Sequence, residues 1–210
     1  MLADGSKHVR DANKASAAEL SKALSISDPT FEVLTSSELS KQLREDIFAM
    51  LETNMRDLYA QSSFGWDPTD KRKEMFDSLS RFVVARRPDT QALSGYTIFR
   101  FEHEHDSDML YWSAFKLHHL EIQSVYHVLY SYELQVSNAS RRSGLGRKLM
   151  DLLGSIGESW RMRKIMLTVF EANDVALAFY FALGFVVDET SPDTDDDADY
   201  KLLSMQLGKR

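Results

Sequence analysis

The sequence predicts one domain of the mixed α+β class with a helical N-terminal extension. Its 210 residues fit a single core with an added segment. Apolar residues make up 43% and charged residues 27%, which is typical of globular domains rather than disordered or membrane proteins. Stretches rich in β-branched and aromatic residues alternate with stretches whose apolar residues recur about once per helical turn, so both strands and helices are expected.

The chain is divided into an N-terminal arm, residues 1–34, and a main domain, residues 35–210. Residues 7–24 are rich in Ala, Lys, Ser and Leu, which is typical of a helix or a partly ordered arm. Residues 25–29 contain Ser, Asp and Pro and interrupt this pattern.

The main domain is predicted to begin with a long amphipathic helix. Thr35 and Glu38 have the spacing of a capping box, and the apolar residues that follow recur about once per turn. The helix is expected to end near Ala60. A loop over residues 61–68, which carries two aromatic side chains, and a charged connector follow it.

The rest of the main domain is predicted to alternate strands with helices. The expected strands are residues 81–86, 96–101, 124–136, 164–170, 185–187 and 200–207, and the expected helices begin near Leu145 and Val175. Gly184 is expected to end the second of these helices. Residues 102–122 are left unassigned, and the acidic stretch over residues 188–199 is expected to be a solvated loop.

The composition excludes several classes of chemistry. The chain has no cysteine, so disulfides, thiolate metal ligands and a cysteine nucleophile are excluded. Its histidines lack the spacing with carboxylates that zinc sites show, so no metal is expected. The absence of a signal-like start and of an apolar run that could span a bilayer predicts an intracellular protein. The net charge of −7 argues against general nucleic-acid binding and favours a basic partner.

A glycine loop carries the strongest chemical signal. The pattern Arg141-x-x-Gly144-x-Gly146 lies between a predicted strand and a predicted helix. Glycines let the backbone approach a ligand, and the free N–H groups at a helix N-terminus suit a pyrophosphate. Arg142 and Arg147 add positive charge. A tight turn with a glycine N-cap is the alternative explanation.

The glycine loop resembles the acetyl-CoA signature of the GNAT superfamily, which is Arg or Gln, two residues, Gly, one residue, and Gly or Ala. A second family element matches at the family's spacing, in Asn173, Ala176, Phe179, Tyr180, Gly184 and Phe185. The resemblance covers residues 81–207 and implies a mostly antiparallel, splayed sheet flanked by helices, with acetyl-CoA as cosubstrate. The cosubstrate contacts that it implies are Leu134, Gln135, Val136, Arg141, Arg142, Ser143, Gly144, Leu145, Gly146, Arg147, Asn173 and Tyr180.

Finer features are similar to the NatD group of this family. They are the long N-terminal helix, the loop that begins at Tyr59, the pattern Tyr130-x-Tyr132-Glu133-x-Gln135, and residues 167–170 followed by Asn173. The resemblance implies acetylation of the N-terminal α-amine of histone H4 and histone 2A by a monomer in the cytoplasm and nucleus. It implies no direct nucleic-acid or membrane contact. Residues 105–122 look like an insertion relative to shorter relatives.

The resemblance gives Glu133 the role of general base. A protein α-amine has a pKa of about 7.7 to 8.0, against about 10.4 for lysine, so a modest base is enough. Tyr132 is implied to hold the substrate terminus, Tyr130 to assist proton removal, and the Leu134 N–H to stabilise the oxyanion. The residues alone allow an exposed strand charge and two core aromatics instead. Strict alternation puts Glu133 opposite both tyrosines unless a bulge intervenes.

Other implied site residues also have two readings. Asn173 binds pantetheine or caps a helix, and Tyr180 protonates the leaving thiolate or packs in the core. Glu102 and Glu104 bind the arginine of the histone tail or belong to a solvated edge strand. The other residues implied to bind the peptide are Tyr59, Phe64, Trp66, Tyr132, Thr168, Thr190 and Ser191.

Two other functions remain open. A GNAT enzyme that acts on lysine side chains or on a small amine would need a stronger base or tighter desolvation of the amine. A non-catalytic acetyl-CoA-binding module is the second alternative. The presence of Glu133 and of a complete glycine loop argues against it.

Overall fold

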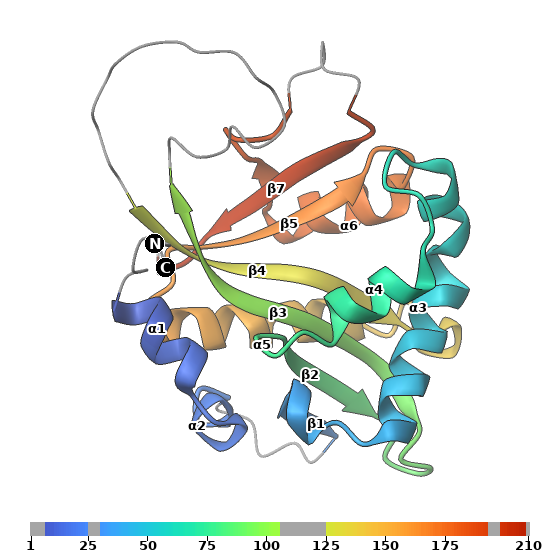
Figure 1. Ribbon diagram of the computed structural model, residues 1–210, viewed down its shortest axis with the longest axis horizontal. Coiled ribbons are helices and arrows are strands. Elements are labelled where there is room, and N and C mark those ends of the chain that lie inside the picture. The colour runs from blue at the N-terminus through green and yellow to red at the C-terminus, as the bar shows by residue number, and fades with distance from the viewer. Residues whose placement is uncertain (1–6, 25–29, 106–124, 193–197, 209–210) are drawn as a thin grey trace.

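The computed structural model describes residues 7–24, 30–105, 125–192 and 198–208 (Figure 1). Its helices are α1 (Lys7–Lys14), α2 (Ala17–Ser21), α3 (Lys41–Gln61), α4 (Pro68–Met75), α5 (Leu145–Ser159) and α6 (Asp174–Leu183), with 3-10 helices η1 (Ser36–Glu38) and η2 (Asn138–Ser140). Its strands are β1 (Phe31–Thr35), β2 (Arg81–Arg86), β3 (Leu93–His105), β4 (Val125–Val136), β5 (Lys164–Phe170), β6 (Val186–Val187) and β7 (Tyr200–Gln206). Within these ranges, the helices are all too short or too polar to cross a bilayer.

The strands form one sheet in the order β1-β2-β3-β4-β5-β7-β6. Every neighbouring pair is antiparallel except β4 and β5, which run parallel. This parallel pairing extends from Val128 with Lys164 to Ser131 with Leu167, and beyond it the two strands diverge (Figure 1). The expected splayed, mostly antiparallel sheet flanked by helices is therefore confirmed.

Hydrophobic side chains form two cores on opposite faces of the sheet. In β2, Val83 and Ala85 pack with residues of α1, α2 and α5, whereas Phe82 and Val84 pack with residues of α3 and α4. Figure 1 shows α3 and α4 on one side of the sheet and α5 on the other. Successive strand residues point to opposite faces, so a strand covered on both faces has a continuous apolar run.

The long helix α3 begins later than the sequence predicts. Ser40 is its N-cap, and its hydroxyl accepts a hydrogen bond from the Leu43 N–H at 3.2 Å. The capping box of Thr35 and Glu38 is present, but it caps η1. Leu39 has extended backbone angles and separates the two helices, so the chain turns once before α3 starts. The predicted end of the helix is confirmed to within one residue.

Two elements are not predicted by the sequence pattern. β1 pairs with β2 at the edge of the sheet, and the boundary after residue 34 falls inside this strand. α4 forms where a charged connector was expected. Asp67 caps it by accepting from the N–H groups of Thr69 and Asp70, and Pro68 occupies the first turn, where no N–H is needed.

Other predicted elements are found where expected. β2 and β5 have the predicted bounds, and Gly184 ends α6 with a φ of 96°. β3 extends to His105, into the unassigned stretch, whereas residues 106–124 lie outside the described residues. β3 lies between β2 and β4, but β2 pairs with it only from Leu93 to Phe99, so Glu102 pairs with β4 alone.

Candidate active site

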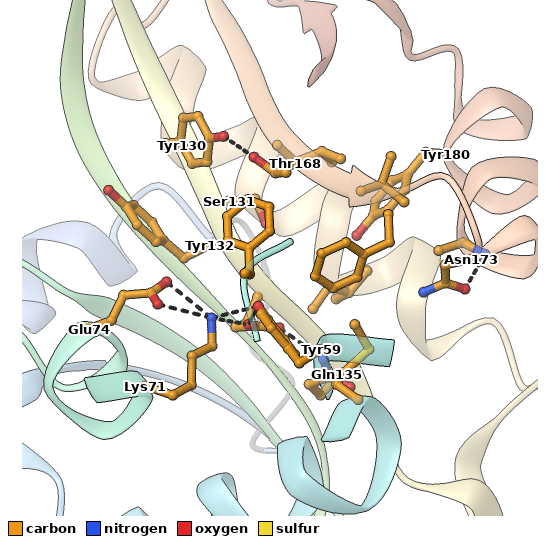
Figure 2. A pocket seen from close by; sticks show the side chains of 18 residues that line it. Tyr59, Lys71, Glu74, Tyr130, Ser131, Tyr132, Gln135, Thr168, Asn173 and Tyr180 are labelled. Atoms are coloured by element: carbon orange, nitrogen blue, oxygen red, sulfur yellow. Dashed lines mark hydrogen bonds and ion pairs between the residues drawn. The ribbon is translucent and has the colours of Figure 1, made fainter. Parts of the chain in front are cut away.

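A cavity of about 350 Å³ lies where β4 and β5 diverge (Figure 2). It is bounded by β4, by β5, by α3 with the loop that follows it, by α4 and by the start of α6. Its lining residues are Met55, Tyr59, Phe64, Lys71, Glu74, Tyr130, Ser131, Tyr132, Glu133, Leu134, Gln135, Leu167, Thr168, Val169, Phe170, Asn173, Ala176 and Tyr180. The predicted catalytic residues are all among them.

A β-bulge brings Tyr132 and Glu133 to the same cavity. In the pairing of β3 with β4, Ile98 lies opposite Glu133 and Phe99 lies opposite Ser131, so Tyr132 is the extra residue. An extra residue interrupts the alternation of side chains, so its neighbours no longer point strictly to opposite faces. Because of the bulge, Tyr132 and Glu133 can line the same cavity although they are adjacent in the strand.

The carboxylate of Glu133 is buried and hydrogen-bonded through both oxygens. Glu133 is only 6% exposed, so the alternative of an exposed strand charge is wrong. Oε1 lies 2.9 Å from Lys71 Nζ and accepts from the Tyr59 hydroxyl at 3.1 Å. Oε2 accepts from Gln135 Nε2 at 2.9 Å. These donors fix the orientation of the carboxylate.

Lys71, which the sequence analysis did not select, is the central cation of the cavity. It is 8% exposed, and its Nζ lies 2.7 Å from the Tyr59 hydroxyl and 3.1 Å from both carboxylate oxygens of Glu74 (Figure 2). No local pattern distinguishes it among the 25 Lys and Arg residues. The signal that could have located it is Asp67 followed by Pro68, a typical helix start that puts Lys71 in the first turn of α4.

Opposing effects set the protonation of this cluster. Burial alone would lower the pKa of Lys71, but Glu133, Tyr59 and Glu74 outweigh it, and the pKa lies above its ordinary value. Burial, and then the negative charge of Glu133, raise the pKa of Tyr59. At neutral pH the ammonium is therefore charged and the phenol keeps its proton, so both groups donate to Glu133.

Tyr132 and Tyr130 each have a polar partner at the cavity. The Tyr132 hydroxyl donates to Glu102 Oε1 at 2.5 Å, and the guanidinium carbon of Arg100 lies 4.2 Å from the centroid of its ring. Burial, and then Glu102, raise the pKa of Tyr132, so the phenol is neutral at physiological pH. The hydroxyls of Tyr130 and Thr168 bond to each other across the divergence of β4 and β5 (Figure 2). Neither tyrosine is solely a core residue.

The loop before α5 fits a pyrophosphate group. Arg142 and Gly144 have positive φ angles of 61° and 85°, and Gly144 is the N-cap of α5. The first hydrogen bond within α5 runs from the Lys148 N–H to the Gly144 carbonyl. The N–H groups of the three residues before Lys148 therefore have no acceptor within the helix and can bind an anion. A side chain at Gly146 would approach the Phe179 ring to 3.2 Å, which explains the small residue there.

The other predicted cosubstrate contacts lie in this loop, at the end of β4 and in the lining of the cavity. They are the exposed Arg141, Ser143 and Arg147, the partly buried Leu145, Val136 at the end of β4, and the cavity residues Leu134, Gln135, Asn173 and Tyr180. Asn173 is the N-cap of α6, because its Oδ1 accepts from the Ala176 N–H at 3.2 Å. Among the described residues, its amide nitrogen has no hydrogen-bond partner. Tyr180 lines the cavity and also packs against Phe185 in the core.

Several predicted peptide contacts lie away from the cavity lining. Trp66 packs against two aromatic residues of α3, and Thr190 and Ser191 form hydrogen bonds near the end of β6. Glu102 reaches the cavity through its bond to Tyr132, and the side chain of Glu104 lies outside the described residues. Tyr59, Phe64 and Thr168, by contrast, line the cavity as the resemblance implies.

The acidic stretch after β6 is not wholly a solvated loop, which corrects the prediction. Asp188 is 6% exposed and forms an ion pair with Lys164 at 3.0 Å, because a buried ammonium needs a partner. Asp199 accepts from the N–H and the hydroxyl of Ser63 at 2.6 and 2.7 Å. Residues 193–197 lie outside the described residues.

Comparison with known proteins places the chain in a family. Residues 47–185 match the model of the acetyltransferase (GNAT) family. Tetrahymena GCN5 has a similar structure, with a TM-score of 0.58 and 14% identity over 86% of this chain and 97% of that chain. A GNAT-family acetyltransferase from Staphylococcus aureus Mu50 has a TM-score of 0.57 and 13% identity over 85% and 99% of the two chains. The NatC complex bound to Gag peptide and CoA has a TM-score of 0.51 and 17% identity over 85% and 99%. Because the family match spans more than half of the sequence, the chain belongs to the GNAT family of acetyltransferases.

Proposed function

We propose that this acetyltransferase moves the acetyl group of acetyl-CoA to the N-terminal α-amine of histone H4 and histone 2A, in the cytoplasm and nucleus. The observation that carries the proposal is the bulge in β4, which puts Glu133 and Tyr132 beside one cavity. An amine that enters this cavity meets a carboxylate that can accept a proton and a phenol that can hold the peptide terminus.

Glu133 is the proton acceptor in this proposal, directly or through a water. The amine nitrogen bonds to the acetyl carbon, the thioester C–S bond breaks, the amine proton passes to Glu133, and the thiolate takes up a proton. The Leu134 N–H stabilises the oxyanion. Tyr180 also lines the cavity, and burial, and then Glu133, raise the pKa of its phenol, so the phenol keeps its proton at neutral pH and can donate a hydrogen bond to the thiolate.

The carboxylates around the cavity favour a basic peptide. Glu74 lines the cavity with a side chain that is 41% exposed, and Glu102 lies behind Tyr132. A guanidinium forms strong, paired hydrogen bonds with carboxylates. An arginine that follows a small N-terminal residue, as in the proposed tails, would therefore be stabilised next to the bound terminus.

A lysine side chain is the second candidate acceptor. The Nζ of Lys71 lies 2.9 Å from Glu133, so an ε-ammonium can pair with this carboxylate. Lysine has a pKa of about 10.4, against about 7.7 to 8.0 for an α-amine, so much less of it is neutral at physiological pH. This difference favours the α-amine for a site with a carboxylate base.

Turnover on peptides that begin Ser-Gly-Arg-Gly-Lys, with a free or a blocked α-amine, tests the proposal. We expect acetylation of the free peptide, no acetylation of the blocked one, and a loss of about 100-fold in kcat for Glu133→Gln. The matched control is Glu158→Gln, an exposed glutamate of α5 outside the cavity lining, which should keep full activity. Melting temperatures of both variants separate loss of the base from unfolding. Turnover of the blocked peptide would move the acceptor to lysine, and no turnover on either would overturn the enzymatic proposal.

A further inference from the structure

A chain of side-chain hydrogen bonds joins the glycine loop to the carboxylate of the cavity. Arg141 Nη2 donates to Asn54 Oδ1 at 2.8 Å, and Asn54 Nδ2 donates to Gln135 Oε1 at 3.0 Å. Gln135 Nε2 then donates to Glu133 Oε2 at 2.9 Å. Three elements contribute to it, because Asn54 lies on α3, Gln135 and Glu133 lie on β4, and Arg141 precedes α5.

The two ends of this chain fix the direction of every bond in it. A guanidinium can only donate, so Asn54 must present its oxygen to Arg141 and its amide nitrogen to Gln135. A carboxylate can only accept, so Gln135 must present its nitrogen to Glu133. The two amides are therefore aligned, and aligned hydrogen bonds strengthen one another at sites of low dielectric.

The chain is enclosed where it reaches the carboxylate. Gln135 is 4% exposed and Glu133 is 6% exposed, whereas Asn54 is half-buried and Arg141 is exposed to solvent. Asn54 Nδ2 also donates to the carbonyl of Val136 at 3.2 Å, so it holds the last residue of β4 against α3. A change at the exposed end can therefore reach the buried carboxylate through three side-chain hydrogen bonds.

We propose that Asn54 is a positioning residue that couples the occupancy of the cosubstrate loop to the orientation of Glu133. The proposal rests on the proposed function, in which the loop binds the pyrophosphate of acetyl-CoA and Glu133 is the base. The bond to Asn54 uses only one of the several donors of Arg141, so the guanidinium can hold Asn54 and a phosphate oxygen at once. A bound pyrophosphate then orders Arg141, and through Asn54 and Gln135 it orders the carboxylate.

Two substitutions of Asn54 separate the two ends of the chain. Asn54→Asp keeps an acceptor for Arg141 but has no donor for Gln135, which must turn its amide and present an oxygen to Glu133. We expect the dissociation constant of CoA to change less than about twofold and kcat to fall about tenfold. Asn54→Leu removes both bonds of the chain as well as the bond to the Val136 carbonyl, so we expect the same loss of kcat together with CoA binding about threefold weaker.

The control is Gln42→Leu, an amide-to-leucine change at an exposed position of the same helix, where Gln42 bonds to Asp46. CoA binding is measured by calorimetry, and kcat is measured with the amine that the wild type acetylates. A merely structural role of Asn54 would lower the melting temperature and change kcat and CoA affinity in parallel in both variants. That result, or an unchanged kcat in Asn54→Asp, would overturn the coupling.

A double-mutant comparison tests whether Asn54 acts through Gln135. Gln135→Met removes the donor to Glu133, so adding Asn54→Asp to it should lower kcat by less than about twofold more. If the loss of kcat in the double variant equalled the product of the two single losses, Asn54 would not act through Gln135. If the enzyme acetylated only lysine, the proposed α-amine acceptor would be wrong. The ratios of kcat between variants and wild type would still test whether Asn54 acts on Glu133 through Gln135. An absence of turnover on every amine would overturn both.

Discussion

At the scale of single residues, Lys71 organises the charges of the cavity. Its ammonium contacts the carboxylates of Glu133 and Glu74 and the hydroxyl of Tyr59. A charge this deeply buried is tolerated only when it is paired and hydrogen-bonded. The same contacts keep the Glu133 carboxylate in one position beside the bulge of β4.

Replacing Lys71 by methionine tests this role. Lys71→Met keeps an unbranched side chain but leaves the buried Glu133 carboxylate without its cation, so we expect a loss of about 3 kcal/mol in the free energy of unfolding. We also expect kcat to fall at least about tenfold, because Glu133 loses a donor that orients it. Chemical denaturation and steady-state kinetics measure the two effects.

The matched control is Lys73→Met on the same helix. Lys73 has a side chain that is 72% exposed and pairs with Asp70, so its removal should leave stability and kcat nearly unchanged. If Lys71→Met were as stable and as active as this control, Lys71 would have no organising role.

At the scale of elements, an ion pair joins the start of β5 to the end of β6. Lys164 is the first residue of β5, and Asp188 follows the last residue of β6. Burial alone would raise the pKa of Asp188, but hydrogen bonds from Ser204, Thr190 and Lys164 outweigh it and lower the pKa from 3.8 to about 2. The pair therefore contributes to the stability of the part of the sheet formed by β5, β7 and β6.

The stability from this pair should depend on pH in a defined direction. A lowered pKa in the folded state contributes stability above the ordinary value of 3.8 and loses it as the pH falls through about 2. We expect Asp188→Asn to lower the free energy of unfolding at neutral pH by on the order of 2 kcal/mol, and the difference from wild type to shrink between about pH 4 and pH 2. Denaturation at a series of pH values measures it.

Asp57→Asn is the control for this series, because Asp57 is an exposed residue of α3. Its curve should follow that of the wild type at every pH. A gap for Asp188→Asn that stays constant down to pH 2 would mean that charge is not the source of the stabilisation.

At the scale of the whole molecule, the loop after α3 joins the two parts of the splayed sheet. Because β4 and β5 pair only from Val128 to Ser131, other contacts must hold their diverging ends. Ser63 bonds to Asp199, and the Phe64 ring lies 5.6 Å from that of Phe170 and 5.3 Å from that of Tyr200, measured between centroids. The loop thus spans the cavity from α3 to β5 and β7.

Removing the anchor of this loop should affect the peptide more than the cosubstrate. Asp199→Ala removes two hydrogen bonds to Ser63, so we expect the KM for the acceptor to rise about fivefold while the KM for acetyl-CoA stays within about twofold. Asp151→Ala, an exposed aspartate of α5, is the control. Equal changes in both KM values would show that the loop supports the fold as a whole rather than the acceptor side.

The glycine loop could be predicted from the sequence because its determinants are contiguous. Arg141, Gly144 and Gly146 lie within six positions, and the left-handed backbone at Gly144 and the helix start beside it depend on local conformation. The apolar periodicity of α5, the glycine that ends α6 and the strand-forming residues of β4 and β5 are also local. The fold class follows from these elements taken in order.

The sequence by itself determined the order of elements from β2 onward and the glycine loop, and the family resemblance of its motifs pointed to Glu133 as a candidate base. The tertiary structure decided how that base is held. Asn54 and Gln135 lie 81 positions apart, and Tyr59 and Glu133 lie 74 positions apart. Hydrogen bonds and ion pairs act over about 3 Å, so packing of helices on the sheet, which local patterns do not specify, selects their partners. The bulge that turns Tyr132 and Glu133 toward one cavity is likewise set by the pairing of β4 with β3, not by β4 alone.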